Sequence, residues 1–191
     1  MIMKKLNAIS LLIITFSLNN CLAQTPVSIQ GIEFVASIQL PDVNVPDALM
    51  VATLDLEKRS ITDKWIMDNA TANFPMALDS KNHRLFIGCR NPAKLLVINS
   101  ETGKTINQID ISSDTDDVFY DGSSKQIYVS CGEGYIDIVS QIDQDNYKSI
   151  ARVESRSGAR TSLYVPELDQ LIIAAPARSG IEAQLMIYQK K

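Results

Sequence analysis

Histidine, cysteine and aromatic residues are all scarce in this sequence, and each shortage removes a class of function. The only histidine among the 191 residues is His83, so a Ser/His/Asp triad, a His-ligated haem and a His-rich metal centre lack the residues they need. The three cysteines form no CxxC pair and no Cys/His cluster, which argues against a structural zinc site. Aromatic residues make up 6% of the chain, and we interpret Trp65 and Tyr135 as packing residues rather than stacking platforms.

The first 23 residues have the pattern of an export signal. Lys4 and Lys5 precede an apolar run, residues 8–16, that is shorter than the about 20 residues needed to span a bilayer. We expect cleavage near Ala23 and a secreted or periplasmic protein without a transmembrane segment in its mature form. The alternative is a lipoprotein anchored through Cys21, although Asn20 is larger than the residue that normally precedes a lipidated cysteine.

The remaining chain is acidic and holds two cysteines. Without residues 1–23 it carries 16 basic and 22 acidic residues, which argues against a broad nucleic-acid surface but leaves room for a local basic patch. Cys89 and Cys131 lie 42 residues apart at matching positions of neighbouring repeats. Adjacent sheets pack about 10 Å apart and a disulfide needs Cβ atoms within about 4.5 Å, so we expect two buried thiols, with pairing as the alternative.

The chain repeats itself with a period of about 42 to 44 residues. Asp79 matches Asp121 at a separation of 42 residues, and Ile127 matches Leu171 at a separation of 44. Within a repeat, short apolar strands alternate with Gly, Pro, Asn and Asp turns, a pattern typical of β-structure. The predicted strands of the first full repeat are 76–78, 85–87, 95–98 and 106–111.

Four antiparallel strands per repeat predict an all-β fold, a β-propeller of about four blades. The domain would cover residues 24–191, and its first blade would lack an inner strand while its last ends after a third strand. Segment 32–40 resembles the outer strands of the repeats, and we expect it to complete the last blade. The expected blades are 43–67 (partial), 72–111, 114–155 and 158–189.

Several sequence runs resemble the YVTN-type (YncE-like) β-propeller repeat family of bacteria over residues 43–188 and strand 32–40. The resemblance implies an exported propeller, typically of seven blades, in a mostly uncharacterised group. The group and its neighbours include binding proteins, some with nucleic-acid affinity, and redox quinoprotein or haem relatives. The runs are ANFPMALD (72–79), RLFIGCR (84–90), DTDDVFYD (114–121), IYVSCGEGYIDI (127–138) and GARTSLYVPEL (158–168).

This sequence is shorter than that family pattern. We hypothesise an in-frame deletion of some three blades, about 130 residues at the repeat length, between residues 40 and 43. Three outcomes stay open: a strained four-bladed ring, an open arc, or a domain whose exposed blade faces close by self-association.

Candidate site residues lie in the loops that a propeller gathers on one face, where loops carry function. Their mixed charge suits a polar small-molecule or anion site, and Arg156, Arg160 and Arg178, if clustered, would hold phosphate or carboxylate. The alternative is a set of solvated loops with turn-capping side chains. The candidates are Asn73, Arg90, Asp114, Asp116, Asp117, Glu133, Arg160 and Arg178.

Three carboxylates within four residues, Asp114, Asp116 and Asp117, raise the question of a hard cation such as Ca²⁺. Strand alternation would point neighbouring carboxylates apart, and a turn-forming role for these residues is the alternative, so we predict no metal site. We also assign no cofactor and no catalytic residue from the sequence. The leading hypothesis is a non-enzymatic binding or scaffold protein for an unknown small polar ligand or protein. The alternatives are a metal-dependent propeller lactonase or related hydrolase, and a truncated propeller without activity.

Overall fold

The computed structural model describes residues 42–45, 49–55, 57–67 and 70–190, all within the packing unit Gln39–Lys191. The expected signal segment 1–23 and the expected strand 32–40 lie outside the described residues. The regular structure of the described part is β-strand, apart from one short 3-10 helix, η2 (Pro166–Leu168). In this part of the chain, no helix is long and apolar enough to cross a membrane.

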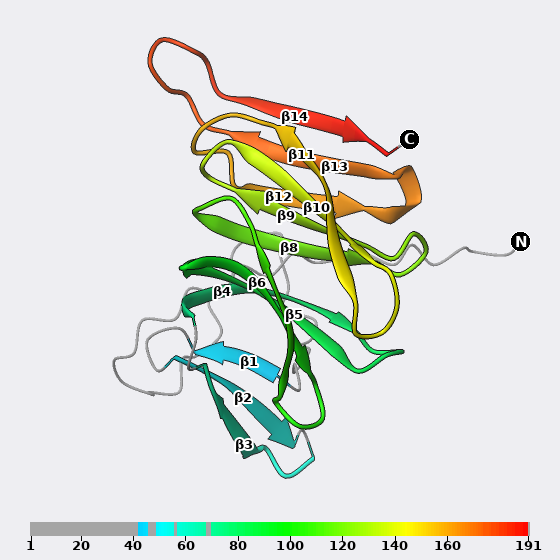
Figure 1. Ribbon diagram of the computed structural model, residues 1–191. Helices are drawn as coiled ribbons and strands as arrows, with labels where there is room; N and C mark the ends of the chain where they lie inside the picture. Colours follow the sequence, from blue (N-terminus) through cyan, green and yellow to red (C-terminus); the bar gives the residue numbers. More distant parts are fainter. Residues whose placement is uncertain (1–41, 46–48, 56, 68–69, 191) are drawn as a thin grey trace, which may run out of the picture. The chain divides into compact units, whose positions relative to one another are not determined.

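The strands form four antiparallel sheets in chain order, called blades 1 to 4 below (Figure 1). Blades 2 and 3 have the predicted four strands, whereas blades 1 and 4 have three strands each among the described residues. Blade 1 holds β1 (Asp42–Val45), β2 (Met50–Asp55) and β3 (Ser60–Ile66); blade 2 holds β4 (Thr71–Asp79), β5 (Arg84–Asn91), β6 (Ala93–Asn99) and β7 (Thr105–Asp110). Blade 3 holds β8 (Thr115–Asp121), β9 (Gln126–Cys131), β10 (Tyr135–Gln141) and β11 (Tyr147–Glu154); blade 4 holds β12 (Thr161–Val165), β13 (Gln170–Ala175) and β14 (Gln184–Gln189).

The inner strand of blade 2 is longer than its sequence pattern predicts. The prediction covered residues 76–78, whereas β4 begins at Thr71. The pairing of β4 with β5 shifts register between Asn73 and Met76, around Pro75, so the two-residue alternation is broken inside the strand. Strand β5 likewise continues through Gly88, where a Cβ atom would lie 2.7 Å from Pro75 and 3.0 Å from Thr115. This glycine therefore allows a close approach of neighbouring chain segments rather than a turn.

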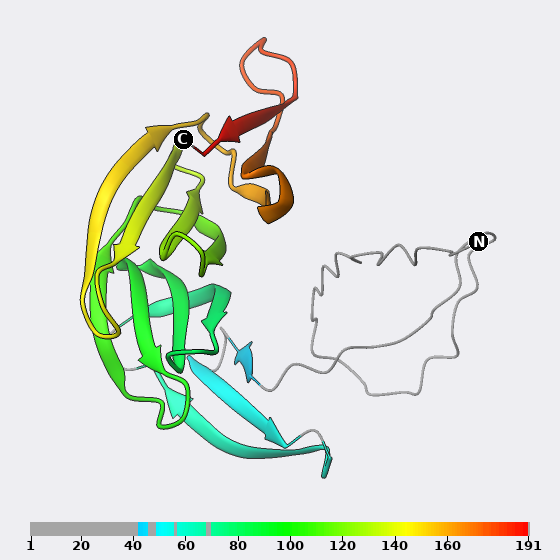
Figure 2. The same ribbon diagram turned by 90° about the vertical axis from the view of Figure 1, so that its right-hand side faces the viewer.

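Each pair of neighbouring blades encloses one apolar cluster, and Figure 2 shows the sheets side by side in chain order. Val51 of blade 1 packs with Ile87 and Ile98 of blade 2. The other faces of β5 and β6 point the opposite way, so Phe86 and Val97 join the cluster shared with blade 3. A third cluster joins blades 3 and 4. Alternate residues of one strand thus stabilise two different interfaces.

The last two strands of blades 1, 2 and 3 share one irregularity. Their pairing shifts between Thr53 and Leu54, between Val97 and Ile98, and between Ile138 and Val139. A bulge at the same place in each repeat bends the outer strand in the same way. The repeat is therefore conserved in backbone geometry as well as in sequence pattern, and it relates blade 1 to the two complete blades.

Cys89 and Cys131 are free and fully buried, in the clusters between blades 1 and 2 and between blades 2 and 3 respectively. This confirms the expectation of two buried thiols. Burial raises the pKa of each thiol to about 12, so neither is poised to act as a thiolate nucleophile near neutral pH.

Candidate functional site

Two arginines and two aspartates from three blades form one ion network. Arg90, in β5, lies 3.3 Å from Asp114 and donates a hydrogen bond of 2.7 Å to Asp116. Arg160, just before β12, donates to the second oxygen of Asp114 at 2.5 Å and lies 3.4 Å from Asp116. The four charges alternate in sign and balance one another. The structure thus brings together four of the predicted site residues, and their hydrogen-bonding groups are largely engaged with each other.

Asp117 and Asn73, also predicted for the site, face other partners. Asp117 accepts a 2.6 Å hydrogen bond from the backbone N–H of Ser162 in blade 4, and burial raises the pKa of its carboxyl group. Asn73 is fully buried and donates to the backbone carbonyl of Met50 in blade 1 at 3.4 Å. Each of these side chains therefore joins two neighbouring blades.

The three carboxylates considered for a cation are divided between these two arrangements. Asp114 and Asp116 face the arginines, whereas Asp117 faces Ser162. Within the described residues, no group of three or more His, Cys, Asp or Glu side chains is placed to hold a metal ion. The alternation of β8 (Thr115–Asp121) gives the physical reason, because consecutive side chains leave opposite faces of a strand.

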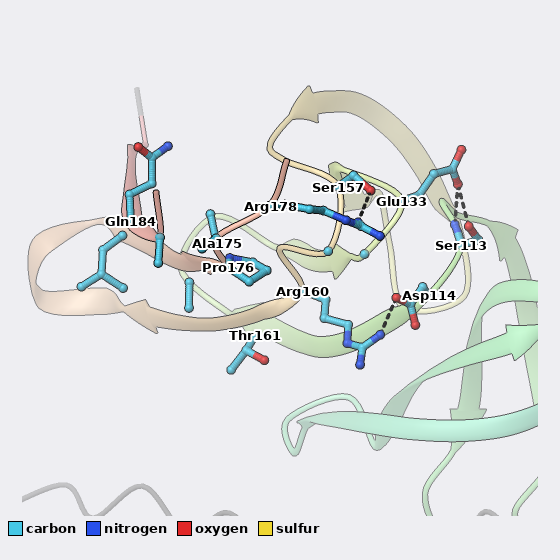
Figure 3. A pocket seen from close by; sticks show the side chains of 16 residues that line it. Ser113, Asp114, Glu133, Ser157, Arg160, Thr161, Ala175, Pro176, Arg178 and Gln184 are labelled. Carbon is cyan, nitrogen blue, oxygen red and sulfur yellow. Dashed lines mark hydrogen bonds and ion pairs between the residues drawn. The ribbon is translucent and has the colours of Figure 1, made fainter. Parts of the chain in front are cut away.

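A hollow of about 1040 Å³ opens beside this network, between the loops of blades 3 and 4 (Figure 3). The β7–β8 and β9–β10 loops contribute Ser113 and Glu133, and the β11–β12 and β13–β14 loops contribute Ser157 and Arg178. Arg160 lies at its edge, where Figure 3 shows its side chain pointing toward Asp114. The wall is polar on the loop side, while alanines and Pro176 line the blade 4 side.

Glu133 and Arg178, two charged side chains of the hollow, differ in the number of hydrogen bonds that they make with the protein. Glu133 accepts hydrogen bonds from the backbone N–H and the hydroxyl of Ser113 at 2.7 and 3.0 Å, and these bonds hold the pKa of its carboxyl group below the ordinary value. Arg178 is exposed and donates one hydrogen bond, 2.8 Å long, to the Ser157 hydroxyl (Figure 3). In the described part of the chain, no carboxylate lies within 4.0 Å of its guanidinium group.

Arg156 has a structural use next to the hollow. Its two terminal nitrogens donate to the backbone carbonyls of Ala175 and Glu182, at 2.6 and 3.1 Å. This guanidinium group thus ties together the two ends of the β13–β14 connection that carries Arg178. Of the three arginines that the sequence offered for oxyanion binding, Arg160 and Arg178 line the hollow, and Arg156 supports the loop behind it.

Glycines give the loops their tight approach. Gly158 has φ +84, and a Cβ atom there would lie 3.3 Å from Nη1 of Arg178. At Gly132 a Cβ atom would collide with the carboxylate of Asp114. Side chains at either position would displace the charged groups that surround the hollow.

His83 lies away from these residues, in the turn between β4 and β5. It is exposed, and its Nδ1 lies 3.7 Å from Oε1 of Glu101. The hollow itself holds hydroxyl groups, guanidinium groups and carboxylates without a histidine or cysteine among its lining residues. The chemistry that this arrangement offers is hydrogen bonding and charge pairing.

A second set of polar contacts was not predicted from the sequence. Asp79 and Asp121, the last residues of β4 and β8, each accept a hydrogen bond from the next blade. The donors are Gln141 at 3.0 Å and Lys190 at 2.6 Å, and each donor directly follows or ends the third strand of its blade. The 42-residue match between Asp79 and Asp121 was the available signal, because a carboxylate repeated at one position indicates a repeated contact.

Comparison with known proteins places the fold but gives no family. No family model and no curated protein matches the sequence. Solved structures do match it: hydrazine synthase of Kuenenia stuttgartiensis has a TM-score of 0.68 at 13% identity, over 85% of this chain and 49% of that chain. A chain of a mitotic checkpoint complex has a TM-score of 0.61 at 16% identity, over 76% and 44%. Sqt1 of Saccharomyces cerevisiae has a TM-score of 0.55 at 10% identity, over 75% and 39%.

These similarities show a β-propeller fold, which confirms the fold class expected from the repeats. At such low identities they carry no information on function. The chain spans less than half of the length of each of the three solved chains.

Proposed function

We propose that this chain is an exported, non-enzymatic β-propeller binding protein whose hollow between blades 3 and 4 receives an oxyanion group of a polar ligand. The observation that carries the proposal is the state of Arg178, an exposed guanidinium group at a polar hollow with a hydroxyl as its hydrogen-bond partner. A guanidinium group presents five N–H donors in a planar fork that matches carboxylate and phosphate groups. Most of that fork is available to a ligand.

The surrounding charges support an anion rather than a cation at this place. Asp114 and Glu133, the carboxylates of the hollow, are engaged with Arg160 and with Ser113. Arg178 therefore supplies the positive potential toward the open side of the hollow. The hydroxyl of Ser157 holds one edge of its guanidinium group in place, which lowers the entropy lost when a ligand binds.

Export and family membership belong to the same proposal. A signal segment with cleavage near Ala23 would deliver the protein to the periplasm or the exterior, with anchoring through Cys21 as the alternative. The YVTN-type resemblance is supported by the positions of its quoted runs, which fall on β4, β5, β8, β9, β10 and β12. Mass spectrometry of the exported protein tests the export part, since an N-terminus at Gln24 supports soluble export and a lipid on Cys21 contradicts it.

The binding test compares two arginine variants. Succinate and inorganic phosphate, titrated at low ionic strength by calorimetry, are the carboxylate and phosphate probes. A charge-assisted hydrogen bond contributes about 1.5–3 kcal/mol, so Arg178→Gln should weaken binding of the preferred probe by about 10- to 100-fold. The matched control is Arg59→Gln in the exposed β2–β3 turn, which should bind like the parent.

Two results would contradict the proposal. One is equal binding of a probe by the parent and by Arg178→Gln, which would place the anion elsewhere. The other is metal-dependent turnover of sugar lactones by the purified protein, which would favour the hydrolase alternative.

A further inference from the structure

Blades 2 and 3 each present the same apolar positions to the blade that follows. In blade 2 these are Phe86 and Val97, which pair directly across β5 and β6. Both are fully buried, and the rings of Tyr120 and Tyr147 in blade 3 lie 5.1 and 5.7 Å from the ring of Phe86. The equivalent pair in blade 3 is Tyr128 and Ile138, and both pack in the cluster shared with blade 4.

Blade 4 carries the same pair, and among the described residues no further blade packs on it. Ile172 and Ile187 pair directly across β13 and β14, at the register position of Phe86–Val97 and Tyr128–Ile138. Yet Ile187 is 61% exposed, and its neighbours Leu185 and Leu163 are 69% and 40% exposed. We call this surface the open face of blade 4. It consists of Leu163, Val165, Ile172, Ala174, Leu185 and Ile187.

Blades 2 and 3 each have a carboxylate at the edge of the corresponding face, and the open face of blade 4 has none at that position. Asp79 and Asp121 end β4 and β8 and accept hydrogen bonds from the following blade. At the same register position, the residue that pairs with Gln170, blade 4 has Val165. The face is therefore more continuously apolar than its counterparts, and exposed apolar surfaces of this kind mark sites of protein contact.

Blade 1 carries the complementary surface. The side of blade 2 that packs on blade 1 includes Leu96 and Ile98 of β6. The equivalent side of blade 1 holds Met50 and Leu54, paired across the sheet with Ile66 and Ile61, which are 63% and 52% exposed. We call this surface the back face of blade 1. Its accessible residues are Met50, Leu54, Ile61, Lys64 and Ile66, whereas Ala52 between them is buried.

We propose that the open face of blade 4 packs on the back face of blade 1 of a second copy of this chain, as consecutive blades pack within one chain. Both surfaces are present on every copy, and each has the apolar side chains that the internal interfaces bury. Among the described residues, blade 1 and blade 4 of the same chain do not pack on each other as neighbouring blades do. A second copy supplies the cover that the described residues of one chain do not provide.

Two copies are the smallest number that covers both surfaces on every chain. Contact between unlike surfaces produces either a closed ring or an open filament, depending on the rotation between copies. With two copies the contact is made twice, so the second contact forms within the complex at high effective concentration and closes one ring of eight sheets.

The test is the mass of the full chain in solution, measured by sedimentation velocity between about 1 and 100 μM protein. The expected species is a dimer. Ile187→Glu would place a charge in the apolar contact and should raise the dimer dissociation constant by at least about 100-fold. Ile66→Glu on the back face of blade 1 should have the same effect. The matched control is Ile142→Glu, since Ile142 is 58% exposed but lies in the loop after β10, outside both faces.

A mixing experiment identifies the pairing of the two faces. Chains with Ile187→Glu and chains with Ile66→Lys should each be monomeric alone. Mixed together they should form a heterodimer with one Glu–Lys contact and one unchanged contact. Circular dichroism confirms that each variant is folded before it is mixed.

Three results would overturn the proposal. These are a monomeric parent at 100 μM, an open-ended polymer in place of the dimer, and a dimer that Ile187→Glu and Ile66→Glu leave intact. Ile187→Glu and Ile66→Glu leave the lining of the hollow unchanged, because neither residue belongs to it, so oxyanion binding can be measured separately in these variants. Ala174 and Leu185 are unsuitable for this test, since they belong to both surfaces.

Discussion

The interface between blades 2 and 3 and the open face of blade 4 are built from the same positions of the repeat but have opposite environments. Phe86 and Val97 are fully buried, whereas Ile187, the counterpart of Val97, is 61% exposed. The residue type is apolar in both places, so strand pattern alone does not distinguish them. What differs is the presence of a following sheet, and burial in this fold is therefore a property of neighbouring repeats.

The same comparison applies to the polar edge of each face. Asp79 and Asp121 accept hydrogen bonds from the next blade, while Val165 occupies that position in blade 4. Where a following blade exists, a carboxylate at this place is used. The substitution by valine keeps an unpaired charge out of a surface that is otherwise apolar.

The largest loss of stability is expected at the buried interface between blades 2 and 3. Phe86→Ala would remove a fully buried ring that contacts Tyr120 and Tyr147, and should lower the free energy of unfolding by about 3–5 kcal/mol. Urea denaturation followed by circular dichroism measures the loss. Leu168→Ala is the control, because Leu168 is 57% exposed and its truncation should cost no more than about 0.5 kcal/mol. Similar losses in the two variants would show that blades 2 and 3 are not packed as described.

Removal of the polar contact between blades 3 and 4 should cost less. Asp121 accepts hydrogen bonds from Ser123, Ser124 and Lys190, and Asp121→Asn should lower the free energy of unfolding by about 1.5–3 kcal/mol. The control is Asp110→Asn, which removes an exposed ion pair with Lys94 and should leave the urea midpoint unchanged.

The loss at Asp121 should depend on pH in one direction. Burial opposes ionisation, but the hydrogen bonds from Lys190, Ser123 and Ser124 outweigh it and hold the pKa of the carboxyl group below its ordinary value. A carboxyl group with a depressed pKa in the folded state stabilises the fold above its unfolded pKa, near 4, and this contribution is lost as pH falls through the folded pKa. The difference between parent and Asp121→Asn should therefore be complete at about pH 5 and above, and should shrink below about pH 4. A difference that grows on acidification would contradict this account.

Much of the fold can be predicted from the sequence because matching positions of the repeat occupy equivalent places in the structure. The 42-residue match of Cys89 with Cys131 placed both thiols in equivalent interiors, and the structure confirms that they are buried and free. Strand lengths were less predictable. Pro75 and Gly88 are residue types that usually interrupt strands, yet both lie inside strands here. A register shift in β4 accommodates Pro75, and side chains of other strands fill the space beside Gly88.

The sequence suggested which loop residues lie near one another, but not the contacts between them. Arg90, Asp114, Asp116 and Arg160 do lie together, as their loop positions suggested. Their mutual pairing depends on the rotation between three blades, which alternation within one strand does not encode. The sequence likewise does not indicate that Arg178 donates to a hydroxyl group rather than to a carboxylate.

The smallest change in stability is expected on the open face of blade 4. Val165→Asp restores the carboxylate that blades 2 and 3 have at this position, but among the described residues no blade follows to supply a donor. In chains that also carry Ile187→Glu, which keeps two copies apart, the added charge should change the free energy of unfolding by no more than about 0.5 kcal/mol. Urea denaturation of the double variant against Ile187→Glu alone measures this. A loss as large as that of Asp121→Asn would mean that position 165 is covered within a single chain, and the two faces would then differ less than their exposure indicates.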